Sequence, residues 1–112
     1  MREYSLTTPP PPFDVIIFTG KLKNNSADFA HKSIELYSLM EEEEGFLGSE
    51  VVKNENNFVT VHYYWQDLNL IRIWDEINAF MNEKEGNEMK WFEHYKMRIG
   101  RIEREFEVAN KE

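Results

Sequence analysis

The stretch Phe46–Trp65 reads FLGSEVVK-NENN-FVTVHYYW and decides the fold. Two runs rich in β-branched and aromatic residues flank Asn54–Asn57, a polar segment whose asparagines tolerate left-handed backbone conformations. The pattern predicts a β-hairpin with strands at Phe46–Lys53 and Phe58–Trp65. The segments on either side of this hairpin each carry the pattern of a helix and a strand.

The chain before the hairpin predicts a buried strand followed by a helix. Val15–Thr19 is apolar on both alternating faces, which is typical of a central strand covered on both sides, and Gly20 is expected to end it. Turn and N-cap residues at 24–26 precede a run of apolar residues spaced by three or four positions: Ala30, Ile34, Tyr37 and Met40. This run predicts a helix over Ala27–Glu43 that ends before Gly45.

The chain after the hairpin predicts two helices and a last strand. Asp67 is expected to cap a helix over Leu68–Met81, and a second, short helix is expected over Glu88–Lys96. From Met97 onward the spacing fits a helix or a strand. Gly100 favours the strand, because glycine in a helix interior costs about 1 kcal/mol relative to alanine. The resulting β-α-β-β-α-β order is ferredoxin-like and belongs to the α+β class.

Composition and charge limit what the domain is expected to bind. The chain has 112 residues, enough for one domain, and its eight Phe, five Tyr and three Trp predict a well-filled core or an apolar interface. Its net charge of −8 repels phosphate backbones and anionic membrane surfaces, so neither nucleic acid nor membrane is an expected partner. With no cysteine, no secretion-signal pattern and no apolar run near the ~20 residues that cross a bilayer, the expected location is cytoplasmic.

Three segments are expected along the chain. Residues 1–12 end in four prolines and form an N-terminal arm, residues 13–108 form the ferredoxin-like domain, and residues 109–112 form a C-terminal tail. At the end of the first helix, Glu41–Glu44 place negative charge at the negative end of the helix dipole. We interpret these glutamates as a solvated face, with an acidic docking or cation-binding patch as the alternative.

One set of residues recurs in a characteristic order: Val15–Phe18 after a proline-rich lead-in, Gly45–Gly48 with Glu50, Tyr64-Trp65, Trp74, Trp91–Ile99, and Glu103-Arg104. Over about Phe13–Phe106 this set resembles the antibiotic biosynthesis monooxygenase (ABM) domain family, and more closely its uncharacterised bacterial branch. The resemblance implies a dimeric α+β barrel. In such a barrel two ferredoxin-like protomers pack their sheets together, and each keeps a cavity between its sheet and its helices.

The resemblance also implies a chemistry. Some members of the family oxidise aromatic polyketides without metal or flavin, because an electron-rich phenol or anthrone that has lost a proton reacts with oxygen directly. The protein then supplies a dry cavity, orientation and hydrogen bonds. For this chain the resemblance implies a homodimer that uses no cofactor and binds a small aromatic or quinol-like substrate. The catalytic candidates are His62, Trp74 and Tyr95, and the expected pocket lining is Tyr64, Trp65, Trp74, Phe80, Trp91, Tyr95 and Arg98.

The chain departs from the family pattern at several positions. Haem-degrading members use a histidine ten residues after the tryptophan that matches Trp74, where this chain has Lys84. They also use an asparagine in the first strand, where Val15–Thr19 has none, so haem degradation is not expected. Close relatives usually carry a histidine on the helix after Trp74. This chain has Ile77 and Phe80 in that region, and these apolar residues favour binding without catalysis.

Each candidate residue also has a plainer interpretation. The tryptophans and tyrosines fit core or dimer-interface anchors better than pocket walls, since aromatic side chains bury the most area in a small fold. His62 fits a packed strand residue as well as a base, and the three histidines lack the spacing of a metal site. The arginines at 98, 101 and 104, with the glutamates at 103 and 105, predict a cross-strand ion-pair ladder, or one arginine that faces an anionic ligand.

Two functions therefore stay open. One is a cofactor-independent monooxygenase that acts on a small electron-rich aromatic molecule. The other is a non-catalytic dimeric module that binds a small hydrophobic ligand or serves a stress response. An RNA-binding domain of the same β-α-β-β-α-β order would need basic strands with exposed rings, and the net charge of −8 argues against it.

Overall fold

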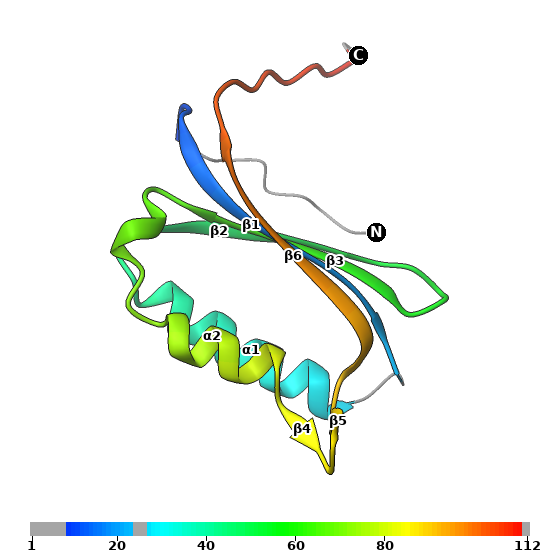
Figure 1. Ribbon diagram of the computed structural model, residues 1–112. Helices are drawn as coiled ribbons and strands as arrows, with labels where there is room; N and C mark the ends of the chain where they lie inside the picture. Colours follow the sequence, from blue (N-terminus) through cyan, green and yellow to red (C-terminus); the bar gives the residue numbers. More distant parts are fainter. Residues whose placement is uncertain (1–8, 24–26, 111–112) are drawn as a thin grey trace.

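The computed structural model describes residues 9–23 and 27–110 (Figure 1). The α+β class and the predicted β-α-β-β-α-β order are confirmed, with a 3-10 helix and a small hairpin added in the second half. The elements are β1 (Phe13–Leu22), α1 (Ala27–Glu41), β2 (Phe46–Lys53), β3 (Phe58–Trp65), η1 (Leu68–Leu70), α2 (Trp74–Met81), β4 (Lys84–Glu85), β5 (Glu88–Met89) and β6 (Phe92–Ile102). The cap expected at 24–26 and most of the N-terminal arm lie outside the described residues.

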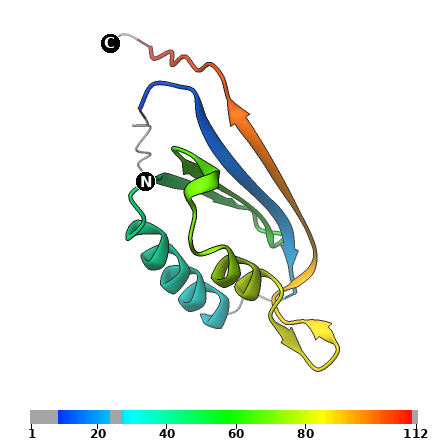
Figure 2. The same ribbon diagram turned by 60° about the vertical axis from the view of Figure 1, so that its left-hand side comes forward.

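The four long strands form one antiparallel sheet in the order β2-β3-β1-β6. β1 pairs with β3 and β6, so Ile17 lies opposite His62 on one side and Arg98 on the other. Both views place α1 and α2 on the same face of this sheet (Figure 2). Because side chains alternate along a strand, half of each strand packs on the helices. β1 is an interior strand as predicted, but helices of the described chain cover only one of its faces.

The core fills the space between the helices and the sheet. Phe18 of β1 and Trp65 of β3 are each 1% exposed, and Met40 of α1 is fully buried. Ile77 of α2 and Phe92 of β6 pack into the same cluster. Removing this apolar surface from water, at about 25 cal/mol per Å², is the main term that holds the two helices on the sheet.

Gly20 lies inside β1 and does not end it, contrary to the sequence-based expectation. A Cβ atom at this position would lie 3.0 Å from Cδ1 of Phe92 and 3.0 Å from Cβ of Tyr95. The glycine therefore lets β6 and its aromatic side chains approach β1 closely. The strand continues to Leu22, where the pairing with β6 shifts its register.

The short helix predicted over Glu88–Lys96 is wrong. This segment forms β5 and the first half of β6, and a turn with Gly86 at φ +67° joins β4 to β5. β6 pairs with β1 from Phe13 to Leu22, and these long-range backbone bonds override the local helical spacing of the aromatic residues. Trp91 and Tyr95 consequently do not share a helix face.

The helix predicted over Leu68–Met81 is divided into η1 and α2. Asp67 does cap the first piece, because its side chain accepts a hydrogen bond from the Asn69 N–H. Ile71 is extended, and the backbone N–H of Arg72 donates to the carboxylate of Glu43 at 2.9 Å instead of to a helical carbonyl. This side-chain acceptor replaces the helical bond and separates the two helices.

The solvated-face interpretation of Glu41–Glu44 is wrong at Glu43, which is 9% exposed. Its carboxylate also accepts hydrogen bonds from Nε and Nη2 of Arg72, at 3.2 and 3.1 Å. The backbone N–H of Arg72 is the main cause that lowers the pKa of Glu43, and burial opposes it. The other three glutamates of the run are exposed. Glu43 thus ties the end of α1 to the segment that leads into α2.

Candidate functional site

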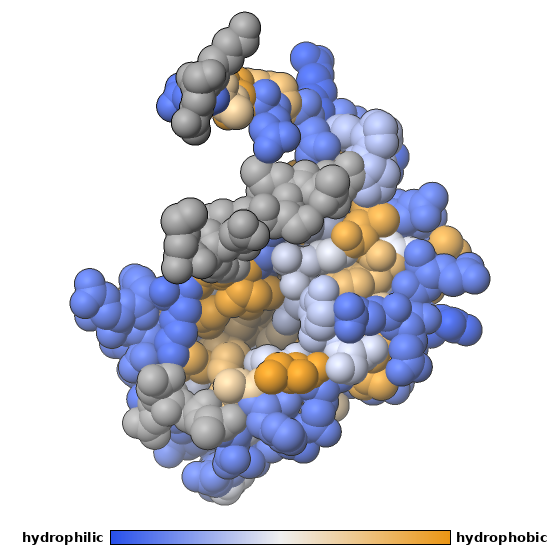
Figure 3. Space-filling view, turned by 180° about the vertical axis from the view of Figure 1, so that it is seen from behind, coloured by the Kyte–Doolittle hydropathy of each residue, from blue (hydrophilic) through white to orange (hydrophobic). Residues whose placement is uncertain are grey.

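An apolar cavity of about 400 Å³ lies between α1 and the β2–β3 part of the sheet. Seen from behind, the molecular surface is hollowed and apolar in this region, with hydrophilic residues around it (Figure 3). Phe18 of β1 and Val59 and Val61 of β3 contribute from the sheet, and Phe80 of α2 and Phe92 of β6 contribute further apolar surface. The volume is within the ~300–1,000 Å³ that small-molecule sites occupy.

Helix α1 supplies the side of the cavity that faces the sheet. Phe29 and Ser33 lie on this side, and Phe29 also contacts the rings of Phe80 and Phe92. The hydroxyl of Ser33 donates to the carbonyl of Phe29 at 2.8 Å, so its hydrogen-bonding capacity is directed to its own helix. Edge strand β2 adds Ser49 and Lys53. The cavity is therefore mostly hydrocarbon, with its polar atoms confined to a few side chains.

Tyr63 is the buried polar side chain of the cavity lining. It is 7% exposed, and no partner for its hydroxyl is found among the described residues. Burial raises the pKa of Tyr63 to about 12, so the phenol is protonated at neutral pH. Sequence reasoning overlooked this residue. The alternation of Val59, Val61 and Trp65 along β3 placed it on the buried face, and that pattern was the available signal.

Acidic side chains and histidines are missing from the cavity lining in the part of the chain that the structure describes. A reaction in the cavity would thus receive no general base from a carboxylate or an imidazole in this lining. Lys53 is the ionisable cation that contacts the cavity. The lining suits a hydrophobic molecule, and the chemistry of the site would depend on the molecule that binds.

Among the residues predicted to line a pocket, Phe80 lies in the cavity lining. Trp65 and Trp91 belong to the core, and their Nε1 atoms are buried without a hydrogen-bond partner in the described chain. Trp74 is half-buried at the start of α2. The ring of Tyr95 stacks on Phe18 at 4.9 Å, and its hydroxyl donates to Oδ1 of Asn82 outside the cavity.

His62, Tyr64 and Arg98 lie on the opposite, open face of the sheet, in register with Ile17 and Val15 of β1. The hydroxyl of Tyr64 donates to Oε1 of Glu50 at 2.5 Å and lies 3.1 Å from Nδ1 of His62. Burial is the main cause that raises the pKa of Tyr64, and the carboxylates of Glu50 and Glu105 add to it. The structure therefore separates these residues from the cavity and groups His62 with Tyr64.

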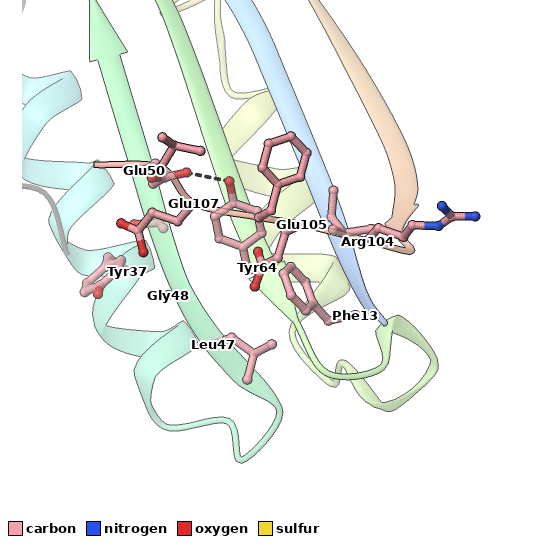
Figure 4. Close-up of a pocket in the computed structure, with 13 residues that line it drawn as sticks. Phe13, Tyr37, Leu47, Gly48, Glu50, Tyr64, Arg104, Glu105 and Glu107 are labelled. Atoms are coloured by element: carbon pink, nitrogen blue, oxygen red, sulfur yellow. Dashed lines mark hydrogen bonds between the residues drawn. The ribbon is translucent and has the colours of Figure 1, made fainter. Parts of the chain in front are cut away.

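A second groove, of about 890 Å³, runs beside this polar group (Figure 4). Phe13, Glu50 and Tyr64 form its side on the sheet, and residues 104–108 after β6 form the other. Of the predicted arginine ladder, Arg101 pairs with Asp14 at 3.8 Å and with Glu103 at 3.3 Å. Tyr37 contacts both the groove and the apolar cavity. Neither of these two hollows brings the predicted catalytic residues together.

No group of three or more His, Cys, Asp or Glu side chains in residues 9–23 and 27–110 is placed to hold a metal ion. No helix in these ranges has the length and hydropathy needed to span a membrane.

The chain resembles an uncharacterized protein in sequence and several solved structures in fold. No family model matches the chain. The uncharacterized protein YqjZ of Bacillus subtilis is 26% identical over 105 residues, which cover 94% of this chain and 92% of YqjZ.

Solved structures extend the comparison. SnoaB, a cofactor-independent oxygenase from Streptomyces nogalater, superimposes with a TM-score of 0.62 over 89% of this chain and 100% of SnoaB, at 7% identity. A conserved protein from Methanosarcina mazei gives a TM-score of 0.60 over 84% of this chain and 94% of that protein, at 14% identity. Likeness at these identities concerns the fold alone, and the chain has the ferredoxin-like α+β fold of these proteins.

Proposed function

We propose that the chain is a cofactor-independent monooxygenase of the ABM type, which binds a small electron-rich aromatic or quinol-like molecule in the cavity beside α1. The observation that carries the proposal is this mostly apolar cavity of about 400 Å³ between sheet and helices. The fold shared with SnoaB, which is a cofactor-independent oxygenase, supports the same reading.

The proposed reaction takes its electrons from the substrate. In an anthrone, the methylene carbon loses its proton, the carbanion reduces O₂, and a carbon–oxygen bond forms. The O–O bond then breaks, one oxygen atom stays as the new carbonyl, and the other leaves as water with the two methylene hydrogens. Since no carboxylate or imidazole lines the cavity in the described part of the chain, the substrate has to be acidic enough to ionise without them. The side chains orient it and exclude bulk water.

A pair of serines on α1 tests the proposal. Ser33 and Ser38 each donate to the carbonyl four residues earlier, at 2.8 and 3.1 Å, but only Ser33 is part of the cavity lining. With anthrone as the probe, the wild type is expected to accelerate oxygen uptake, Ser33→Phe to return it toward the uncatalysed rate, and Ser38→Phe to leave it unchanged. Wild-type protein that gives no oxygen uptake above the buffer rate would refute the oxygenase.

A second candidate, a non-catalytic module that binds a small hydrophobic ligand, is favoured because the described residues of the lining include no carboxylate or imidazole. It predicts that anthrone binds at one molecule per chain and is recovered unchanged beyond its spontaneous oxidation. Ser33→Phe would then abolish binding, and oxygen uptake would be the same with and without protein.

We also propose a cytoplasmic homodimer in which a second copy covers the open face of the sheet. Helices of the described chain leave that face uncovered (Figure 2). Val52 and Phe58 expose 56% and 42% of their surface there, and Phe106 beyond β6 exposes 91%. A second copy would remove these apolar side chains from water.

A further inference from the structure

Tyr63 differs from the other tyrosines of the sheet in how its hydroxyl is used. The hydroxyl of Tyr64 donates to Glu50, and that of Tyr95 donates to Asn82. Tyr63 has no such partner in the described residues, although it is the most buried of the three. The Tyr63 hydroxyl is also not one of the fully buried unpaired side-chain atoms, which in the described residues are Nε1 of Trp65 and Nε1 of Trp91, so it reaches the surface of the cavity.

The surroundings of Tyr63 are mostly hydrocarbon. Its side chain leaves β3 on the same face as Val61 and Trp65, and it lines the cavity with Phe18 and Phe80. The protein thus places a phenol hydroxyl that has no partner among the described residues at the surface of a mostly hydrocarbon cavity. A ligand that brings its own hydrogen-bond acceptor would bond to this hydroxyl in place of water.

The hydroxyl acts as a donor under physiological conditions. Burial raises the pKa of Tyr63 to about 12, so the phenol keeps its proton throughout the neutral range. A hydroxyl donor in an apolar cavity selects for a neutral oxygen acceptor on a hydrophobic molecule. Ketone and quinone carbonyl groups on aromatic rings have this chemistry, whereas a hydrocarbon of the same shape would leave the hydroxyl unpaired.

We propose that Tyr63 is a specificity-determining residue, whose hydroxyl selects aromatic ketones and quinones over aromatic hydrocarbons of equal size by donating a hydrogen bond to their carbonyl oxygen. The inference rests on the proposed function insofar as both place a small aromatic ligand in the cavity beside α1. It adds the acceptor group that the ligand has to carry and the residue that recognises it.

Fluorenone and fluorene separate the two ligand classes, because they share a flat three-ring shape and differ by a carbonyl in place of a methylene. Their dissociation constants would be measured by calorimetry on the wild type, on Tyr63→Phe, and on Tyr64→Phe, which removes a hydroxyl from the other face of β3. The preference for fluorenone is expected to fall roughly threefold to tenfold in Tyr63→Phe, as for one net hydrogen bond. Tyr64→Phe is expected to keep the wild-type preference.

A spectroscopic readout accompanies the affinities. The carbonyl stretching band of bound fluorenone should lie at lower frequency in the wild type than in Tyr63→Phe, because a hydrogen bond weakens the C=O bond. An unchanged preference and an unchanged band in a folded Tyr63→Phe variant would overturn the proposal while leaving the cavity function intact. Failure of both probes to bind the wild type would overturn the cavity function as well, so the two failures are distinguishable.

Discussion

The substitution Gly20→Ala tests whether the close approach of β6 to β1 holds the cavity side of the sheet together. The added Cβ would lie 3.0 Å from Cδ1 of Phe92, 3.0 Å from Cβ of Tyr95 and 3.1 Å from the carbonyl oxygen of His94. Two of these three neighbours are a backbone atom and the first atom of a side chain. They move only if β6 moves, so the clash has no cheap relief.

The magnitude follows from two opposing terms. Overpacking of a tight site costs about 1–3 kcal/mol, while replacing glycine lowers the entropy of the unfolded chain and recovers about 0.4–1 kcal/mol. The net expectation is a loss of about 1–2 kcal/mol in the free energy of unfolding. For a domain of this size, that loss lowers the melting temperature by roughly 4–10 °C.

Gly100→Ala is the matched control. Gly100 also lies in a strand opposite β1, but its added Cβ would meet only Cγ1 of Val15, at an ordinary contact distance of 4.0 Å. Thermal unfolding followed by circular dichroism should therefore show Gly100→Ala at or slightly above the wild type, and Gly20→Ala clearly below it. Equal melting temperatures for the two variants would refute the close-approach argument.

Three further outcomes are expected. The pKa of Glu43 is lowered in the folded state, so its contribution to stability is present above the ordinary value of 4.5 and is lost as the pH falls through the folded-state pKa. Glu43→Gln should melt at a lower temperature than the wild type at pH 7 and show a weaker loss of stability in acid, and equal acid profiles would contradict this role. The pKa of Tyr63 is raised from 10.0 to about 12, so its contribution is present below pH 10 and is lost as the pH rises toward 12. Tyr63→Phe should flatten the alkaline part of a pH–melting curve, whereas the same slope as the wild type would count against the burial effect. Sedimentation velocity at micromolar concentration should give twice the chain mass of 13.5 kDa, and a stable single-chain species would exclude the proposed dimer.

The hairpin was predictable to the residue because its signal is local. Two runs rich in β-branched and aromatic residues meet across Asn54–Asn57, and the observed strands have the predicted limits. The segment from Glu88 to Lys96 was not predictable in the same way. Its aromatic spacing imitates a helix, but Glu88–Met89 pairs with β4, and Phe92–Lys96 pairs with β1, at least 70 positions earlier in the chain.

The residues of the candidate site were also predictable only in part. Phe80 was expected in a pocket, and the structure places it in the cavity lining. Tyr63 was not predicted because the resemblance includes Tyr64-Trp65 and not Tyr63. Strand alternation nevertheless places Tyr63 on the same face as Val61. Glu43 is indistinguishable in sequence from its three neighbours. Its partner, Arg72, lies 29 positions away, and only the tertiary structure selects it for burial.

The eight-residue length of α2 has a consequence for how this cavity can change over evolution. Helices shorter than about 12 residues have little stability of their own, so α2 keeps its place through packing and through the Glu43–Arg72 contact just before it. The four-stranded sheet, in contrast, is fixed by backbone pairing along its whole length. Phe80 and Met81, both on α2, are therefore the positions at which cavity size can be altered without disturbing the sheet. Related chains that accept larger or smaller ligands would be expected to differ first at these two side chains.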